Sequence, residues 1–173
     1  QTYVNWELIV VDNCSSDSTE SLVFSYGEPR IRLVKINNGG IIAASRNRGL
    51  RLASGDYVAF LDSDDWWLPQ KLQISVEKLN AGVDFVYHDL YLITSLPAKS
   101  LIWSRVKTRQ VKSPVFQDLL SNGAAIANSS VVVRRNLLNE VGGFSEDPEL
   151  VAAEDYEAWI RVGRRSYSLA ICN

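Results

Sequence analysis

Three carboxylates lie within four positions directly after a run of strand-forming residues. Residues 57–61 are apolar without polar alternation, which is typical of a strand buried on both faces of a parallel sheet. Asp62, Asp64 and Asp65 follow at the carboxyl end of this run, and carboxylate oxygens are ligands of hard divalent ions such as Mg²⁺ and Mn²⁺. In open α/β sheets, ligands also bind at this end of the strands. The alternative is an acidic turn that favours the start of a helix at Pro69.

Asp12 belongs at the same edge as the Asp62–Asp65 cluster if the sheet is parallel. Asp12 ends an apolar stretch, residues 6–12, that has the character of another buried strand. A carboxylate there could accept a hydrogen bond from a base or a ribose. Glu154 and Asp155 open a helical pattern over residues 154–164. Each acid also has a simpler explanation, because Asp is a common turn residue and acids are favourable at helix N-termini.

The elements that must position these acids alternate between strand and helix in the first half of the chain. Strands are expected over residues 6–12, 31–35, 57–61 and 84–87, and helices over 17–26, 41–53 and 69–80. This alternation predicts an α/β fold with a mostly parallel sheet and helices on its faces. The second half is less regular. It predicts a loop or an edge hairpin over 95–112, a strand over 130–134, and helices over 114–121, 136–141 and 154–164.

The composition is that of a single globular domain. The 173 residues are 46% hydrophobic and 22% charged, and the net charge of −2 gives no indication of a nucleic-acid partner. No apolar run approaches the ~20 residues that span a bilayer. Cys14 and Cys172 lack metal-ligand spacing, which favours free thiols in a reducing, cytoplasmic compartment.

Two further features are compatible with binding but have simpler explanations. The single histidine, His88, lies in an expected strand and is expected to bond locally, with metal ligation as the alternative. A basic run near Trp103 is expected to be a solvated face, with docking to an anionic lipid surface as the alternative. This run comprises Arg105, Lys107, Arg109 and Lys112.

A series of motifs, in order and over nearly the whole chain, resembles the family-two glycosyltransferases with the GT-A fold. Residues 8–19 (LIVVDNCSSDST) are similar to that family's IVVDDGSTDGT segment. The RNRG of residues 46–49 and the ASGDYVAFLDSDD of residues 53–65 follow. The last two segments are SVVVR with VGGFSE, then EDYEAW from residue 154. A single DxD pattern is weak evidence, whereas this ordered series is strong.

The resemblance implies a GT-A domain over residues 1–173 that binds a nucleotide-sugar donor, expected to be uridine-linked. Residues 1–93 would form the donor half and residues 94–173 the acceptor half. Asp12, with Asn13 beside it, would receive the pyrimidine ring. The residues expected at the ribose and the diphosphate are Asp62, Asp64 and Arg46, the last with a structural ion pair as its alternative.

The same resemblance implies the chemistry. Asp64 and Asp65 would hold Mn²⁺ or Mg²⁺, which stabilises the leaving diphosphate. Asp155 would act as the general base on an acceptor hydroxyl, and a single displacement would invert the anomeric centre. The expected product belongs to cell-surface polysaccharide or glycan synthesis. The acceptor would be a glycan or a lipid-linked sugar, met by a cytoplasmic protein that is peripheral at the membrane.

Departures from the family pattern and rival functions qualify this interpretation. Asn13 and Cys14 replace the usual Asp and Gly, and the opening strand-helix unit is absent before Gln1, so a fragment with weaker donor binding is expected. No QxxRW run follows residue 155, which favours the addition of one sugar. One rival is a catalytically inactive nucleotide-binding relative. Another is a haloacid-dehalogenase-type phosphatase, which needs Thr or Val where Trp66 stands.

Overall fold

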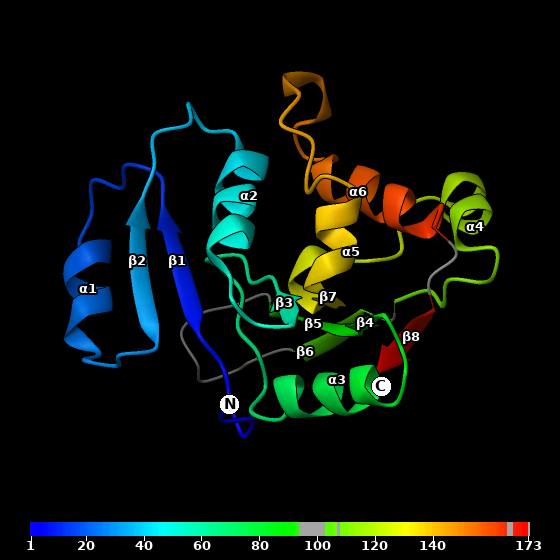
Figure 1. The fold of residues 1–173 in the computed structure, drawn as a ribbon, viewed down its shortest axis with the longest axis horizontal. Coiled ribbons are helices and arrows are strands. Elements are labelled where there is room, and N and C mark those ends of the chain that lie inside the picture. Colours follow the sequence, from blue (N-terminus) through cyan, green and yellow to red (C-terminus); the bar gives the residue numbers. More distant parts are fainter. Residues whose placement is uncertain (94–102, 107, 166–167, 173) are drawn as a thin grey trace.

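A four-stranded mixed sheet lies at the centre of the computed structural model, which describes residues 1–93, 103–106, 108–165 and 168–172 (Figure 1). Its order is β3 (Tyr57–Ala59), β7 (Val132–Arg134), β4 (Phe85–His88) and β8 (Leu169–Cys172). Strand β7 is antiparallel to both of its neighbours, and β4 and β8 are parallel. Three of the four strands therefore run in one direction, as the α/β pattern predicted.

Two other strands form a separate parallel pair. Strand β1 (Leu8–Asp12) pairs with β2 (Ile31–Lys35), in a register that joins Leu8 to Ile31 and Asp12 to Lys35. Figure 1 shows α1 (Thr19–Ser25) on the outer side of this pair and α2 (Ile42–Leu52) between the pair and the rest of the molecule. Helix α2 therefore lies where it can contact both sheets.

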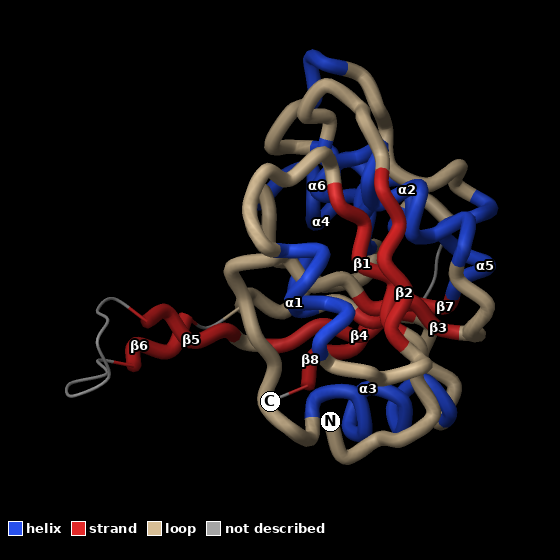
Figure 2. Tube along the Cα trace, turned by 90° about the vertical axis from the view of Figure 1, so that its left-hand side faces the viewer, coloured by secondary structure: helices blue, strands red, loops and turns tan. Residues whose placement is uncertain are grey.

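An antiparallel hairpin projects from the body of the molecule. Strand β5 (Leu90–Ile93) pairs with β6 (Trp103–Val106), and Figure 2 shows the hairpin extending away from the other elements. For residues 95–112 the sequence left a loop and an edge hairpin open. Within the described part of that segment, residues 103–106 form β6, whose partner β5 precedes the segment, and the two strands form a sheet of their own. Residues 94–102 lie outside the described part of the chain.

Helices cover both faces of the central sheet (Figure 1). Helix α3 (Lys71–Asn80) packs on one face, where Leu79, Val86, Val132 and Cys172 form a small buried cluster. The other face carries the larger core. In this core the rings of Phe85 and Phe144 meet the Trp159 ring edge to face, with ring centroids 5.0 and 5.6 Å from that of Trp159. The elements on that side are α4 (Val115–Asn122), α5 (Arg135–Glu140), α6 (Glu154–Gly163) and the 3-10 turn η1 (Asn128–Ser130). A second 3-10 turn, η2 (Pro148–Leu150), precedes α6.

The fully buried strands are not the ones that the sequence indicated. Strands β4 and β7 are buried on both faces, with Phe85, Val86, Val132 and Val133 at most 1% exposed. The run at residues 57–61, expected to be buried on both faces, is only half buried over β3. The reason is its place at the sheet edge, where β7 is its sole partner within the described chain. That part of the prediction was wrong.

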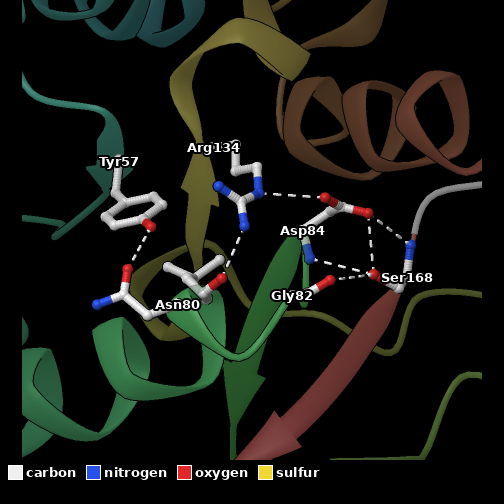
Figure 3. A network of polar contacts seen from close by, with 7 residues as sticks. Tyr57, Asn80, Gly82, Asp84, Arg134 and Ser168 are labelled. Carbon is white, nitrogen blue, oxygen red and sulfur yellow. Dashed lines mark hydrogen bonds and ion pairs between the residues drawn. The ribbon is translucent and has the colours of Figure 1, made fainter.

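A polar network joins the sheet at the end opposite to the acids of residues 62–65 (Figure 3). Arg134 donates from Nε to Asp84 at 3.1 Å and from a terminal nitrogen to the Leu79 carbonyl at 2.7 Å. The other oxygen of Asp84 accepts from the Ser168 amide at 3.1 Å. Asp84 and Ser168 lie at the amino-terminal ends of β4 and β8, and Arg134 lies at the carboxyl end of β7, so the network joins three strands at the end away from the acidic turn.

Candidate active site

The acidic turn, residues 62–65, follows β3 and exposes two of its three carboxylates. Phe60 is buried in the core and anchors the end of the strand, while the Asp65 amide donates to the Asp62 carbonyl at 3.1 Å and closes the turn. Asp64 and Asp65 are exposed, and no residue in the described ranges bonds to either carboxylate. Their oxygens are therefore available to an external cation or donor group.

Arg46 connects this turn to the start of α6. Its side chain is 12% exposed on α2, and one terminal nitrogen contacts Asp62 Oδ1 at 3.0 Å. The other contacts Glu154 Oε1 at 2.6 Å. When the Asn128 amide is oriented to suit its neighbours, its oxygen accepts from Arg46 Nε at 3.2 Å. The guanidinium thus makes the structural ion pairs that the sequence had left as the alternative to phosphate binding.

Asp155 lies in the first turn of α6, next to Glu154. It is half buried, and its Oδ1 accepts from the Tyr156 amide at 2.7 Å. Burial raises the pKa of the Asp155 carboxyl, whereas the bond from Tyr156 and the nearby Arg46 lower it. The net direction is upward, so the carboxylate takes up a proton more readily than an exposed Asp. A raised affinity for protons is what a general base requires.

Asp12 and Asn13 organise the loop after β1. Asp12 is 6% exposed, and its Oδ1 accepts from the Ser15 amide at 3.1 Å, which is the turn-forming role that the sequence allowed. Asn13 Oδ1 accepts from the Asn38 amide at 3.1 Å and so joins this loop to the one before α2. Neither residue makes a described contact with the acidic turn or with Arg46.

Two residues build the site through contacts that the sequence did not predict. Glu154 is 5% exposed and bonds to Arg46, while Asn47 holds the glycine-rich turn before α6. Asn47 accepts from the Phe144 amide and donates to the Phe144 carbonyl, both at 2.8 Å. Arg46 and Asn47 are adjacent in a predicted helix, and adjacent helical residues point in different directions. Their adjacency therefore indicated that the two side chains could contact two separate segments.

A metal site is not preformed among the described residues. Within those ranges, no group of three or more His, Cys, Asp or Glu side chains is arranged to hold an ion. The chemistry of the turn nevertheless fits Mg²⁺ or Mn²⁺, because such ions commonly take one or two carboxylates together with substrate phosphates. Asp64 and Asp65 supply oxygen donors of that kind, unengaged by other described side chains.

The basic run and His88 are largely accounted for by local contacts. Arg105 bonds to Asp89 at 2.8 Å, and Arg109 pairs with Asp118, so two of the four cations are neutralised locally. Lys107 lies outside the described residues. His88 Nδ1 is 2.7 Å from the Asp89 carbonyl oxygen, as the expectation of a local bond stated.

None of the helices in the described ranges is both long and apolar enough to cross a membrane.

Comparisons with known proteins agree with the geometry. The family model "Glycosyl transferase family 2" matches residues 1–134. The UDP-Glc:alpha-D-GlcNAc-diphosphoundecaprenol beta-1,3-glucosyltransferase WfgD of Escherichia coli is 35% identical over 94% of this chain and 60% of its own length. The putative teichuronic acid biosynthesis glycosyltransferase TuaG of Bacillus subtilis is 27% identical over 97% of this chain and 64% of its own. The chain thus spans about three fifths of the length of these curated relatives.

A solved structure shares the fold. The mannosyltransferase PcManGT from Pyrobaculum calidifontis, in complex with GDP-Man and Mn²⁺, superimposes with a TM-score of 0.65 at 24% identity, covering 96% of this chain and 45% of that one. The likeness shows the GT-A fold, and the family match removes the phosphatase alternative. On the match over residues 1–134, the chain belongs to glycosyl transferase family 2.

Proposed function

We propose that the chain carries the donor site and the general base of an inverting glycosyltransferase, which moves one sugar from a nucleotide-diphosphate donor to a hydroxyl acceptor. The observation that carries this proposal is the contact of Arg46 with both Asp62 and Glu154. Through it, the acidic turn and the segment that holds Asp155 share one rim, although 93 positions separate Asp62 from Asp155 in the sequence. A donor on the turn would therefore lie near the base.

The donor is proposed to be uridine-linked, as the name of the WfgD relative states for that protein. Asp12 and Asn13 would receive the base, and Asp62 and Asp64 would contact the ribose and the diphosphate. Arg46 would contribute positive charge beside the diphosphate, because its guanidinium is held at the same edge. Residues 1–93 would then form the donor half.

The cation proposed for Asp64 and Asp65 is Mn²⁺ or Mg²⁺, and Mn²⁺ accompanies the nucleotide sugar in the mannosyltransferase of the same fold. When bound, such an ion supplies charge stabilisation to the departing diphosphate. The two exposed carboxylates of the turn present their oxygens without competing partners in the described chain. Their mutual repulsion is relieved when a cation binds.

Asp155 would take the proton of the attacking hydroxyl. Burial raises the pKa of its carboxyl, so the group takes up a proton more readily than an exposed Asp, as a general base requires. Attack opposite the leaving group in one displacement inverts the anomeric centre. If Asp155 instead attacked the sugar and displaced the diphosphate, the acceptor hydroxyl would then displace Asp155, and the two inversions would give net retention. The product's configuration therefore distinguishes the two roles.

The acceptor is proposed to bind against residues 94–173 and to be a glycan or a lipid-linked sugar. Support comes from the relatives' names, which include a diphosphoundecaprenol-linked acceptor and teichuronic acid biosynthesis. The protein would act in cell-surface polysaccharide synthesis, on the cytoplasmic side and peripheral at the membrane.

Calorimetric titration with uridine diphosphate, with and without Mn²⁺, tests the donor role. We expect binding with Mn²⁺ that weakens strongly when EDTA removes the ion, and weaker binding of guanosine diphosphate. Equal or absent heat in all arms would overturn the metal-nucleotide role. If binding is found without any sugar transfer to a lipid-linked acceptor, the inactive nucleotide-binding relative becomes the better description.

A further inference from the structure

Lys71 occupies a position that is unfavourable for a cation. It is the first residue of α3 and is only 7% exposed. Burial removes water from an ammonium group, and the amino-terminal end of a helix carries partial positive charge that repels it. A cation at this position therefore needs compensating contacts that a Met or Leu would not.

Two contacts compensate, and both lead toward the acidic turn. Lys71 Nζ lies 3.9 Å from the ring centroid of Trp67, the second residue after that turn. The same nitrogen donates to the Val131 carbonyl at 3.2 Å, just beyond η1. Lys71 thus joins the residues after the turn to the segment that enters β7.

Trp67 and Ser129 complete the connection to Asp62. The indole Nε1 of Trp67 donates to the Ser129 carbonyl at 2.8 Å. The Ser129 hydroxyl accepts from the Asp62 amide at 3.0 Å. Ser129 is 4% exposed and both bonds are partly buried, and they contact the turn at its first residue and just after its last.

We propose that Lys71 is a positioning residue for the acidic turn: its ammonium fixes the Trp67 ring, and through Trp67 and Ser129 it holds Asp62 in place. The inference deepens the proposed function, because the turn it positions is the one assigned to the donor and the cation. Lys71 itself touches neither the turn's carboxylates nor Arg46 in the described contacts.

The charge on Lys71 can change near neutral pH. Burial lowers the pKa of Lys71 to about 7, whereas contact with the Trp67 ring and the Val131 carbonyl favours the charged form. The nearby groups are His88 on β4 and Cys172 on β8. Burial lowers the pKa of His88 and raises that of Cys172, and the interaction with Cys172 raises the pKa of Lys71 against the effect of burial. Asp89, beyond His88, is bonded to Arg105 and Thr108, and Lys78 is exposed further along α3.

The hydrogen-exchange rate of the Asp62 backbone amide reports how firmly the turn is held, and it can be measured without any nucleotide sugar. In Trp67→Phe the ring remains but the N–H is lost, and we expect the Asp62 amide to exchange about threefold to tenfold faster, the factor of one net hydrogen bond. Lys71→Met, which keeps a buried side chain of similar length, should have a similar effect. The matched controls are Trp6→Phe, near the start of β1, and Lys78→Met on the same helix, and neither should change Asp62 exchange.

The pH profile separates a charge-dependent role from simple packing. The protection of the wild-type Asp62 amide, corrected for the intrinsic exchange rate, should weaken as pH rises through about 7, because Lys71 loses its proton and the ring contact loses its cation. Lys71→Met should lose this dependence, and Lys78→Met should keep it. A purely structural Lys71 would leave the profile of Lys71→Met parallel to that of the wild type.

The outcomes of the two proposals are distinguishable. An unchanged exchange rate of the Asp62 amide in both Trp67→Phe and Lys71→Met overturns the positioning role, regardless of the result of the uridine diphosphate titration. A wild-type protein that gives no heat with uridine diphosphate and Mn²⁺ contradicts the proposed function, and the exchange data still decide the role of Lys71. If both hold, the two variants should weaken uridine diphosphate binding with Mn²⁺ by about tenfold or less.

Discussion

Arg46 and Glu154, which are 108 residues apart in the sequence, are joined by a hydrogen-bonded ion pair of 2.6 Å from which water is nearly excluded. The pair connects α2 to the amino-terminal end of α6. Since Asp155 follows Glu154 in the first turn of α6, the same contact fixes the position of the proposed base. The position of the base therefore depends on a residue in the first third of the chain.

Arg46→Met should destabilise the protein and reduce activity together. It leaves Glu154 buried without a partner, which costs about 3–5 kcal/mol in the free energy of unfolding measured by denaturant titration. Glu154→Gln combined with Arg46→Met should recover part of that loss, because no buried charge remains. As a control, Arg32→Met removes the exposed pair with Glu7 and should cost no more than about 1 kcal/mol. Equal losses at Arg46 and Arg32 would contradict the role given to the buried pair.

Asp155→Asn should abolish sugar transfer while the affinity for uridine diphosphate stays within about twofold of the wild type. The Asn oxygen can still accept from the Tyr156 amide, so the helix start is kept. In the wild type, burial raises the pKa of Asp155, and the acid limb of the kcat profile should lie above the usual Asp range. Full transfer activity in the variant would remove Asp155 as the base.

The same substitution should stabilise the protein at neutral pH. Because the folded-state pKa of Asp155 is raised, the folded state binds the proton more tightly than the unfolded state. Stability from this group is therefore present at low pH and is lost as pH rises through the folded pKa. Asn mimics the protonated form at all pH values, so the difference in unfolding free energy between variant and wild type should grow from acid to neutral pH. A constant difference would contradict the effect of burial.

Asp64→Asn and Asp65→Asn should each weaken the Mn²⁺-dependent part of uridine diphosphate binding by about tenfold or more. Both carboxylates are exposed, so neither change should lower the melting temperature. Asp56→Asn is the matched control, since Asp56 is exposed at the other end of β3. A metal effect that survives in both turn variants would place the ion elsewhere.

Gly143→Ala should cost more stability than Gly142→Ala. Both residues have positive φ, of 74° and 82°, so both substitutions pay the same backbone penalty of about 1–2 kcal/mol. A Cβ on Gly143 would lie 2.5 Å from Asn47 Oδ1, whereas one on Gly142 meets nothing within 4 Å. The added methyl displaces the amide that holds Phe144, which should cost a further ~1–3 kcal/mol on thermal unfolding. Equal melting temperatures in the two variants would show that the Asn47 side chain moves aside without an energetic cost.

Local patterns predicted most of the elements, and contacts between distant segments account for what they missed. The helices at residues 42–52 and 71–80 follow from apolar periodicity and from glycine and proline signals, which are properties of a short window. Strand β8, Leu169–Cys172, was not predicted, because four apolar residues do not distinguish a strand from a helix segment. The antiparallel insertion of β7 between β3 and β4 has no local signal at all.

For the site as well, local patterns in the sequence were predictive and contacts between distant segments were not. The acidic turn was predicted because its three carboxylates lie within four positions of the sequence, which is a property of a short window. Glu154 and Asp155 are also adjacent and chemically alike, but which of them meets Arg46 depends on how α6 is rotated against α2. The role of Lys71 was missed because burial of a lysine cannot be read from its neighbours in the chain.

The insertion of β7 has a consequence for biosynthesis. Strands β3 and β4 share β7 as a neighbour, and Val132 to Arg134 leave the ribosome only after more than forty further residues have been translated beyond β4. During that interval the edges of β3 and β4 that later face β7 have unpaired backbone groups, which are templates for aggregation. Chaperone capture over this window should therefore raise the yield of active protein.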